Sequence, residues 1–431
     1  MKTKSINRQK WIFLIVAIIY RYYMDMSYIM LSDTYPVEFP LKINIAKSIL
    51  SYLSIVVLIL ITFKKNNLLT SYLFRVLTFF TMIPLSSVYA MKDESSAFFF
   101  ITCSTYLVVQ WVFINNHKET GRTEAYISDT KSVKTLRLSC LAFLVLTTIL
   151  MFLQLGFPSL GALVLENVYD IRQNLHISNY VRYMLWVCAQ VIVPFGIADG
   201  YVRKNKIQIL LCILCQLMFY LWTGNKTWFF AIFLISAIMF LLFFKMKLDY
   251  FLVGVTVLCA FGYYGNENVI GMTVGSFLNR RVLLDPAALK FSYYDYFIVN
   301  SHEPVLFSST VLGPVFRGIC SSSNPDFPYD ISNKYTDKAS NAVTGIYGGD
   351  LANWSWFTFL IVPIALYFLA VSAEKTKYRI GSSFAYIFLT YLFFSFNDQR
   401  IVQFLLDFQG ILLILILYIM SNKTKNYLAK Q

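Results

Sequence analysis

Charged residues are scarce in this 431-residue chain: they make up only 14% of it. An average soluble domain carries about 25% charged residues. Hydrophobic residues make up 57% of the chain and aromatic residues 18%. These values exclude an ordinary soluble domain, and we predict an all-α polytopic membrane protein.

The chain also lacks the short motifs of common enzymes. It has no P-loop, no GxGxxG after a strand, no GxSxG and no His, Cys or carboxylate cluster with metal spacing. The seven cysteines fall mostly in apolar segments, so they predict no disulfide framework. We therefore expect no cofactor and no metal. An enzyme of this composition has to take an activated donor that is already in the membrane.

Long apolar runs are abundant. A spanning helix needs ~20 apolar residues, and we predict twelve such helices, near 11–33, 43–63, 68–90, 97–115, 138–156, 182–201, 207–222, 228–245, 249–264, 351–372, 381–397 and 401–420. This divides the chain into a bundle of the first nine helices (1–264), one large loop (265–350) and a C-terminal part with the last three helices and a tail (351–431).

The net charge of +14 raises the question of a nucleic-acid partner. With the N-terminus placed in the cytoplasm, most of the 37 Lys and Arg residues fall in cytoplasmic segments. The positive-inside rule predicts this bias, which fixes orientation without a polyanionic partner. We expect both termini in the cytoplasm, the 265–350 loop outside, and no nucleic-acid binding.

The 265–350 loop is far longer than a connection needs, and long loops in compact proteins are usually functional or disordered. Its aromatic residues and its apolar runs argue against disorder. We predict a helix around 276–300. We expect an irregular segment over 301–350, with turns at Pro304, Gly313–Pro314, Asn324–Pro325 and Pro328.

Basic residues on the outer face run against the topological bias, which makes them candidates for anion binding. Arginine suits phosphate because its planar fork donates two parallel hydrogen bonds. The alternative is that each residue reaches toward lipid headgroups or pairs with a nearby carboxylate. The candidates are Arg172, Lys226, Arg280, Arg281 and Arg400.

Groups that could accept a proton and groups that could bind sugar lie in the same loop. A general base needs a carboxylate or a neutral imidazole within reach of the reacting hydroxyl, and the candidates are Asp295, His302 and Glu303. Each of them could instead be a structural partner of an arginine. Tyr293, Tyr294 and Tyr296 could stack on sugar rings or belong to an interfacial aromatic belt.

Ionisable residues inside the expected spans are functional candidates by default. Arg21 and Asp25 lie four residues apart on one expected helix, so an ion pair along that helix is the simpler interpretation.

Three segments, and the overall plan of many spans with one dominant outer loop, carry a family resemblance. The segments are TGNKTW (223–228), RRVLLDPAALKFSYYDYF (280–297) and NAVTGIYGGDLANWSW (341–356). The chain resembles the Wzy-type oligosaccharide repeat-unit polymerases of O-antigen and capsule synthesis. One feature departs from some members: the arginine-plus-ten-plus-glycine repeat is absent after Arg172, where Tyr183 takes the glycine position.

The resemblance implies a metal-independent glycosyltransferase of GT-C-like fold, related to the O-antigen ligases, in the bacterial inner membrane. Donor and acceptor would both be oligosaccharides on undecaprenyl pyrophosphate, with a chain-length regulator and a repeat-unit flippase as partners. It further implies that Arg280 and Arg281, with Arg172, Lys226 and Arg400, hold the departing pyrophosphate. Asp295 or His302 would take the proton of the acceptor hydroxyl, and the tyrosines would line the glycan path.

Two alternatives stay open. A polysaccharide flippase or other transporter explains the spans and the intramembrane charges, but not one outer loop of this length, because such transporters need only short connections. An O-antigen ligase of the same fold differs in its acceptor, and the neighbouring genes distinguish it from a polymerase.

Overall fold

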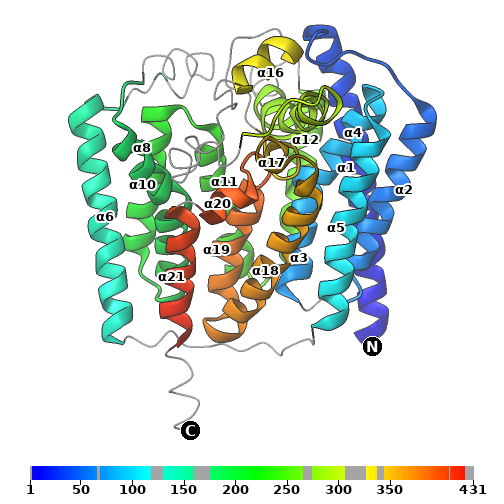
Figure 1. Cartoon of the computed structure of the whole chain (residues 1–431). Helices are drawn as coiled ribbons and strands as arrows, with labels where there is room; N and C mark the ends of the chain where they lie inside the picture. The colour runs from blue at the N-terminus through cyan, green and yellow to red at the C-terminus, as the bar shows by residue number, and fades with distance from the viewer. Residues whose placement is uncertain are drawn as a thin grey trace. The chain divides into compact units, whose positions relative to one another are not determined.

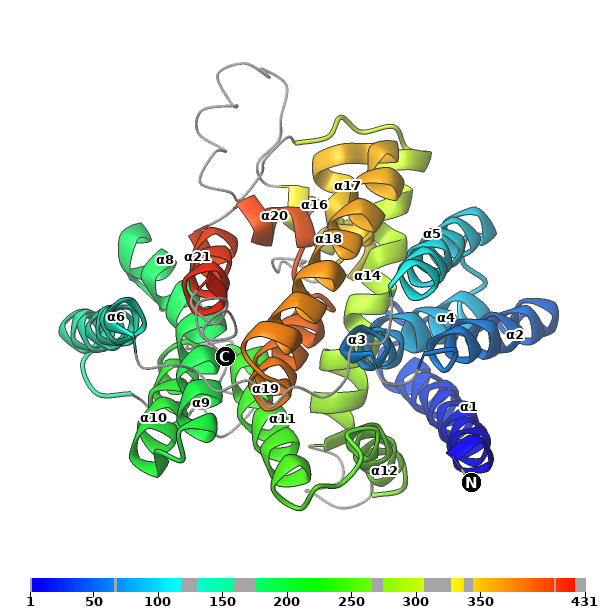
Figure 2. The same ribbon diagram turned by 90° about the horizontal axis from the view of Figure 1, so that it is seen from below.

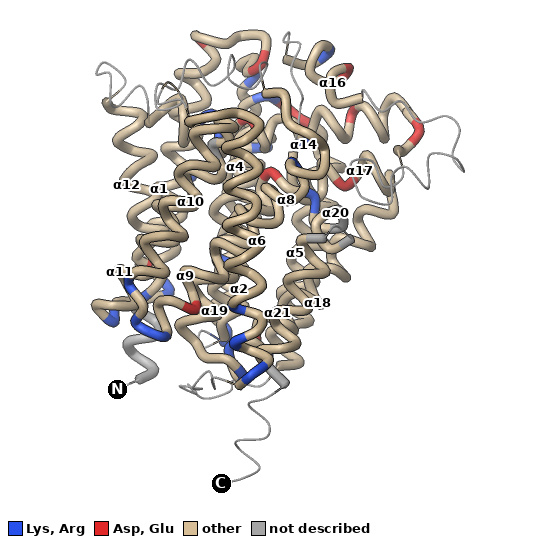
Figure 3. The backbone as a smooth tube through the Cα atoms, turned by 90° about the vertical axis from the view of Figure 1, so that its left-hand side faces the viewer, with Lys and Arg blue, Asp and Glu red and all other residues tan. Residues whose placement is uncertain are grey.

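The computed structural model describes residues 2–65, 68–117, 130–158, 161, 175–265, 274–305, 327–336, 344–406 and 408–422, and the structural statements below concern these residues. Within them the secondary structure is entirely helical. The protein is an all-α polytopic membrane protein, as the composition predicts. Lys, Arg, Asp and Glu lie mainly near the ends of the helices (Figure 3).

Each of the twelve expected segments coincides with an apolar helix. Eight helices are long and apolar enough to cross a bilayer: Gln9–Thr34, Ile45–Thr62, Leu69–Met91, Ser96–Asn116, Lys131–Leu155, Asn179–Val202, Lys206–Thr223 and Gly348–Arg379. Four are shorter: Thr227–Phe243, Tyr250–Tyr264, Ser382–Ser395 and Gln409–Met420. The number of spans stays a prediction, because these four fall short of the ~20 residues that a crossing needs.

The chain folds as two compact units that are interleaved in the sequence, unlike the three consecutive segments expected from hydropathy. Unit 1 comprises Met1–Glu119, Leu248–Val371 and Phe393–Leu406. It contains α1 (Lys2–Thr34), α2 (Ile45–Thr62), α3 (Leu69–Leu77), η1 (Thr78–Met82), α4 (Ile83–Met91), α5 (Ser96–Asn116), α12 (Tyr250–Tyr264), η5 (Gly275–Leu284), α14 (Asp285–Tyr294), η6 (Asp295–Val299), α16 (Phe327–Thr336), α17 (Gly348–Trp354), η7 (Ser355–Phe357), most of α18 (Thr358–Arg379) and α20 (Ile401–Leu406).

Unit 2 comprises Thr120–Lys247, Ser372–Leu392 and Asp407–Gln431. It contains α6 (Lys131–Leu155), α8 (Asn179–Val187), η4 (Cys188–Ile192), α9 (Val193–Val202), α10 (Lys206–Thr223), α11 (Lys226–Phe243), most of α19 (Ser382–Ser395) and α21 (Phe408–Asn422). TGNKT (223–227) forms a tight turn between α10 and α11. Gly224 ends α10 in the left-handed conformation (φ +61°), and the Asn225 side chain caps α11 by accepting from the Thr227 amide.

One long helix of unit 1 runs across the other helices instead of along them. It consists of η5, α14 and η6 without a break, and we call it the transverse helix (275–299). Figure 1 shows it nearly end-on, at the end of unit 1 opposite the N-terminus, and Figure 2 shows its length. It packs against α1, α4, α12 and α17. The predicted helix around 276–300 is therefore confirmed.

Two contacts fix the first turns of the transverse helix. Asn279 Nδ2 donates to Ser27 Oγ at 2.8 Å and to the Cys259 carbonyl at 3.0 Å. A Cβ atom on Gly275 would lie 2.6 Å from the Gly262 carbonyl oxygen, so only glycine allows this helix and α12 to approach so closely. The helix is thereby tied to the ends of α1 and α12.

The expected irregular segment 301–350 is partly helical, which corrects the sequence prediction. Residues 327–336 form α16, and α17 begins at Gly348. Pro328, expected at a turn, is the second residue of α16, where proline is tolerated because first-turn amides lack an intrahelical acceptor. Pro304 lies in a non-helical stretch as expected. The Gly313–Pro314 and Asn324–Pro325 turns lie outside the described residues.

Candidate functional site

Arg280 is held near the start of the transverse helix by an ion pair and an aromatic ring. Its Nη2 donates to Glu38 Oε2 at 2.8 Å, and its guanidinium carbon lies 3.5 Å from the ring centroid of Tyr35. Asp285 Oδ1 lies 3.6 Å from Nε. Burial disfavours the charged form, but Asp285 and Glu38 outweigh it and raise the pKa of Arg280.

Arg281 occupies a more open position beside its neighbour. Its side chain keeps 25% of its surface exposed, and its Nε lies 3.9 Å from Asp285 Oδ2, one helical turn along. The two arginines thus share the Asp285 carboxylate. Both guanidinium groups have carboxylates of the protein as partners.

Lys290 is the fully buried cation of the transverse helix. Its Nζ donates to the Asn397 carbonyl at 2.9 Å, with the Pro286 carbonyl at 3.4 Å. Burial lowers the pKa of Lys290 to about 7, although Asp398 and Asp350 oppose that shift. A buried lysine beside two acidic residues joins α14 to the turn at 396–400.

The TGIYGGD segment (344–350) packs against Lys290 and against the same turn. A Cβ atom on Gly348 would lie 2.6 Å from Lys290 Cα, and one on Gly345 would lie 2.2 Å from the Phe396 carbonyl oxygen. Between these glycines Tyr347 adopts φ +62°, ψ −74°, and the Gly348 amide donates to the Ile346 carbonyl at 2.9 Å. This is the strained form of the γ-turn. Glycine is required at Gly345 and Gly348 because other parts of the chain occupy the space that a Cβ atom would need.

Arg400 is the last residue of the 396–400 turn, and its side chain points at an aromatic cluster. Its guanidinium hydrogen-bonds the Tyr293 hydroxyl, and its carbon lies 5.4 Å from the Phe327 ring centroid. The residue is only 4% exposed. Phe327 is the first residue of α16, so α16 packs beside this guanidinium.

Asp295 is the acidic candidate that its surroundings perturb most. The carboxyl is half-buried, and burial, followed by the charge of Glu94, raises its pKa to about 6, against the opposing charges of Lys92 and Lys334. A carboxyl with this pKa changes protonation near neutral pH, as a general acid or base requires.

The other two base candidates have a different environment. His302 and Glu303 are both exposed, and the imidazole of His302 stacks on the Tyr296 ring at 3.9 Å. Neither lies in a desolvated position where a proton acceptor gains from its surroundings. Of the three candidates for the base, Asp295 alone is therefore half-buried, and the other two are exposed to solvent.

The three tyrosines proposed to line the glycan path are buried in the protein. Tyr293 is fully buried, and Tyr294 and Tyr296 are 5% and 8% exposed. The Tyr294 ring lies edge-on to Trp356, and the Tyr293 ring lies edge-on to Phe327. Tyr293 and Tyr294 form an aromatic layer with α16 and η7.

The remaining cation candidates belong to unit 2. Lys226 is the first residue of α11, and the structure does not describe its side chain. Arg172 lies outside the described residues. The structure thus gathers Arg280 with Arg281 and, separately, Lys290 with Arg400, all in unit 1.

Spacing along the transverse helix separates these groups. Arg281 and Asp295 are fourteen residues apart, which is about 20 Å at 1.5 Å per residue. Tyr293, the partner of Arg400, is two residues from Asp295. Arg281 and Asp295 therefore lie at separate places along the helix.

Sequence reasoning missed Lys290, Asp350, Glu38 and Tyr35 as members of these clusters. Lys290 and Asp350 lie within the segments that carry the family resemblance. The motifs therefore contain these residues, but they do not show which other residues contact them. Glu38 and Tyr35 lie between two spans, and only the fold brings them to Arg280.

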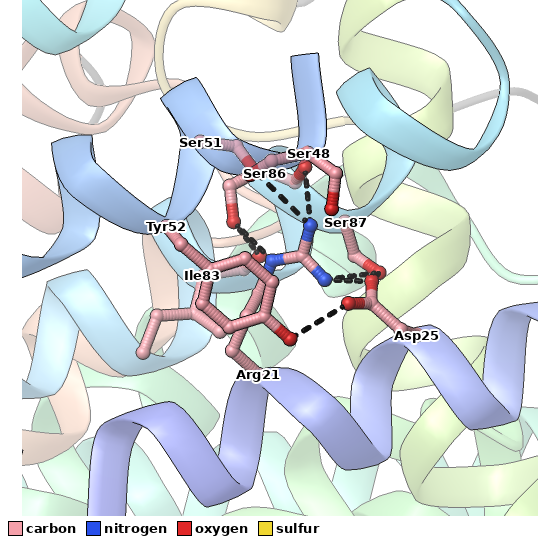
Figure 4. A network of polar contacts seen from close by, with 8 residues as sticks. All are labelled: Arg21, Asp25, Ser48, Ser51, Tyr52, Ile83, Ser86 and Ser87. Atoms are coloured by element: carbon pink, nitrogen blue, oxygen red, sulfur yellow. Dashed lines mark hydrogen bonds and ion pairs between the residues drawn. The ribbon is translucent and has the colours of Figure 1, made fainter. Parts of the chain in front are cut away.

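A second buried network lies within the spans of unit 1, and it confirms the predicted pairing of Arg21 with Asp25 (Figure 4). Arg21 is fully buried. Its Nε donates to Ser86 Oγ, Nη1 to Ser87 Oγ, and Nη2 to Ser51 Oγ and the Ser86 carbonyl, at 2.8 to 3.2 Å. Tyr52 and Ser87 donate to the Asp25 carboxylate. The network leaves no guanidinium nitrogen for a ligand.

Comparison with known proteins identifies no relative: no family model, no curated protein and no solved structure matches the chain. The fold defines the class, a multi-pass helical membrane protein in which several charged residues cluster on one transverse helix.

Proposed function

We propose that this protein is a glycosyltransferase that joins undecaprenyl-pyrophosphate-linked repeat units, as an O-antigen or capsule polymerase at the periplasmic face of the bacterial inner membrane. Its termini would lie in the cytoplasm. The N-terminal end of α1 and the transverse helix lie at opposite ends of unit 1 (Figure 1), which fits this orientation.

One observation carries the proposal. Two separate cation centres lie along the transverse helix, Arg280 with Arg281 and Lys290 with Arg400 of the 396–400 turn, and the helix carries a carboxyl whose pKa is raised to about 6, Asp295. A reaction between two lipid diphosphates needs two anion sites and one group that takes a proton.

We give each centre a role that fits its place along the helix. Arg400, next to Tyr293, stabilises the diphosphate that leaves the donor, because leaving-group charge grows in the transition state. Arg280 and Arg281, about 20 Å along the helix, hold the diphosphate of the acceptor lipid, whose reacting hydroxyl is at the far end of its oligosaccharide. Asp295 accepts the proton of that hydroxyl as it attacks the anomeric carbon.

Deleting the gene and analysing the lipopolysaccharide or capsule of the cells tests the proposal. Loss of a polymerase leaves core bearing a single repeat unit and no ladder. Bare core identifies a ligase instead, and an unchanged ladder rejects both. Labelling a cysteine placed at the exposed Ser301 from outside the membrane tests the orientation, and protection of that cysteine contradicts it.

A further inference from the structure

We propose that Lys290 is a positioning residue that sets the Arg400 guanidinium by holding the 396–400 turn from inside. The inference deepens the proposed function, because it concerns the same cation centre, but the structural part of it does not depend on the reaction.

The turn that carries Arg400 is fixed by backbone and side-chain contacts from four directions. Lys290 Nζ donates to the Asn397 carbonyl at 2.9 Å, and Asn397 Nδ2 donates to the Val282 carbonyl at 2.5 Å. The Thr81 hydroxyl donates to Asn397 Oδ1 at 3.4 Å. The Ile346 amide donates to the Phe396 carbonyl at 3.0 Å. Of these contacts, only the one from Lys290 involves an ionisable group.

Two glycines of the 344–350 segment lie close to Lys290 and Arg400. A Cβ atom on Gly348 would meet Lys290 within 2.7 Å, and one on Gly349 would meet Arg400 Cγ at 2.8 Å. Lys290 and Arg400 therefore lie against consecutive residues of one strained segment.

The environment of Lys290 contains acidic groups that favour a lysine at this position over an apolar side chain. Asp350 of α17 and Asp398 of the turn are the acidic groups that interact with it, and Asp350 Oδ2 also accepts from the Ile401 amide at 3.4 Å. Burying an ammonium is costly unless it is paired and hydrogen-bonded. An apolar side chain could not donate to the Asn397 carbonyl, so the amino group of Lys290 serves the geometry of the turn.

The first test reads the position of Arg400 without any substrate. Phenylglyoxal modification of Arg400 in purified protein, followed by peptide mass spectrometry, reports its exposure. We expect slow modification in wild type and about 10-fold faster modification in Lys290→Met, since the turn loses its inner donor. Lys290→Gln keeps one donor and should fall between them. Lys377→Met, which removes a buried lysine of unit 2 paired with Glu374 at 4.0 Å, is the matched control and should match wild type.

The second test reads the reaction with lipid-linked repeat units in nanodiscs. We expect Arg400→Ala to lower kcat by about 10²- to 10³-fold, the usual loss for one donor to a developing oxyanion. Lys290→Met should lower kcat by a smaller factor with KM unchanged. Their double variant should be no slower than Arg400→Ala alone, because Lys290 acts through Arg400.

The outcomes separate the two claims. An Arg400 that stays protected in both Lys290→Met and Lys290→Gln overturns the inference, whatever the chain catalyses. Additive losses in the double variant overturn it as well. Wild-type protein that does not extend lipid-linked repeat units contradicts the proposed function, while the phenylglyoxal result still decides the role of Lys290.

Discussion

Arg21 and Arg280 are buried to nearly the same degree, 0% and 2% exposed, yet they sit in different kinds of surroundings. The partners of Arg21 come from packed spanning helices and use all three of its nitrogens. Those of Arg280 include Glu38 and Tyr35, from the connection between two spans, and its Nε makes no hydrogen bond. Burial alone does not distinguish a structural arginine from one in a binding site; the completeness and origin of its partners do.

The same contrast explains why the two regions can tolerate different changes. In a closed network the guanidinium nitrogens already have partners within the protein, and none is left for a ligand. Loss of such a network therefore reduces stability. An arginine held by a carboxylate on a connecting segment can exchange that carboxylate for a phosphate. The predictions below test whether this difference holds.

The largest effect is expected at Arg21. Arg21→Met leaves the Asp25 carboxylate buried without its cation, which costs about 3–5 kcal/mol in the free energy of unfolding. We expect a marked drop in membrane protein level and in the thermal midpoint in detergent. Adding Asp25→Leu should restore much of the loss, because an apolar pair replaces the ion pair. Normal stability with lost polymerisation would instead assign Arg21 to a site.

The next largest effect is expected at Asp295. Asp295→Asn removes the proton acceptor and should slow the reaction by about 10²- to 10⁴-fold. Because the pKa of Asp295 is raised to about 6, the protonated form dominates below that pH and cannot accept a proton. The wild-type rate should therefore rise as pH increases through about 6. A variant that keeps this rise shows that another group is the base.

A smaller effect, on binding alone, is expected at Arg281. Arg281→Ala removes a charge-assisted contact to the acceptor diphosphate, worth about 1.5–3 kcal/mol, and should raise the KM for the acceptor by about 10- to 100-fold. Arg281→Lys should fail nearly as badly, since an ammonium cannot reproduce the planar fork. An unchanged kcat supports the role of Arg281 in binding the acceptor. A lowered kcat with an unchanged KM would instead indicate that Arg281 contacts the departing diphosphate of the donor.

Asp285 provides the control for Arg281. If Arg281 only pairs with Asp285 at 3.9 Å, then Arg281→Ala, Asp285→Ala and their double variant should all behave alike. A carboxylate that competes with phosphate predicts the reverse for Asp285→Asn, namely tighter binding of the acceptor.

The helices were predictable from the sequence because a bilayer fixes their length and composition. The segments 97–115 and 207–222 contain no charged residue, and both are helical in the structure. The transverse course of 275–299 was not predictable, since it depends on contacts such as that of Asn279 with Ser27, 252 residues away. Pro328 was misassigned because a proline that opens a helix and a proline in a turn look alike without their neighbours.

The site was predictable only as residue types. RRVLLDPAALKFSYYDYF showed that cations, acids and tyrosines share one helix, but not which of them face inward. Lys290 looks as exposed as Arg281 in the sequence, yet it is fully buried against a turn 107 residues later. Burial of a single charge on a helix depends on what packs there, and hydropathy carries no record of that.

The smallest effect is expected at His302 and Glu303. Both side chains are exposed, and stacking on Tyr296 is the main described contact of the His302 ring. His302→Gln and Glu303→Gln should each change the rate by less than about 3-fold, because groups that stay solvated contribute little to their surroundings. They should also leave the rise near pH 6 in place, since that rise belongs to Asp295. Measuring the pH profile of each variant beside Asp295→Asn makes the comparison direct. A His302→Gln variant that loses the rise would move the proton acceptor from the half-buried carboxyl to the exposed imidazole. Partial desolvation would then no longer mark the functional residues of this helix.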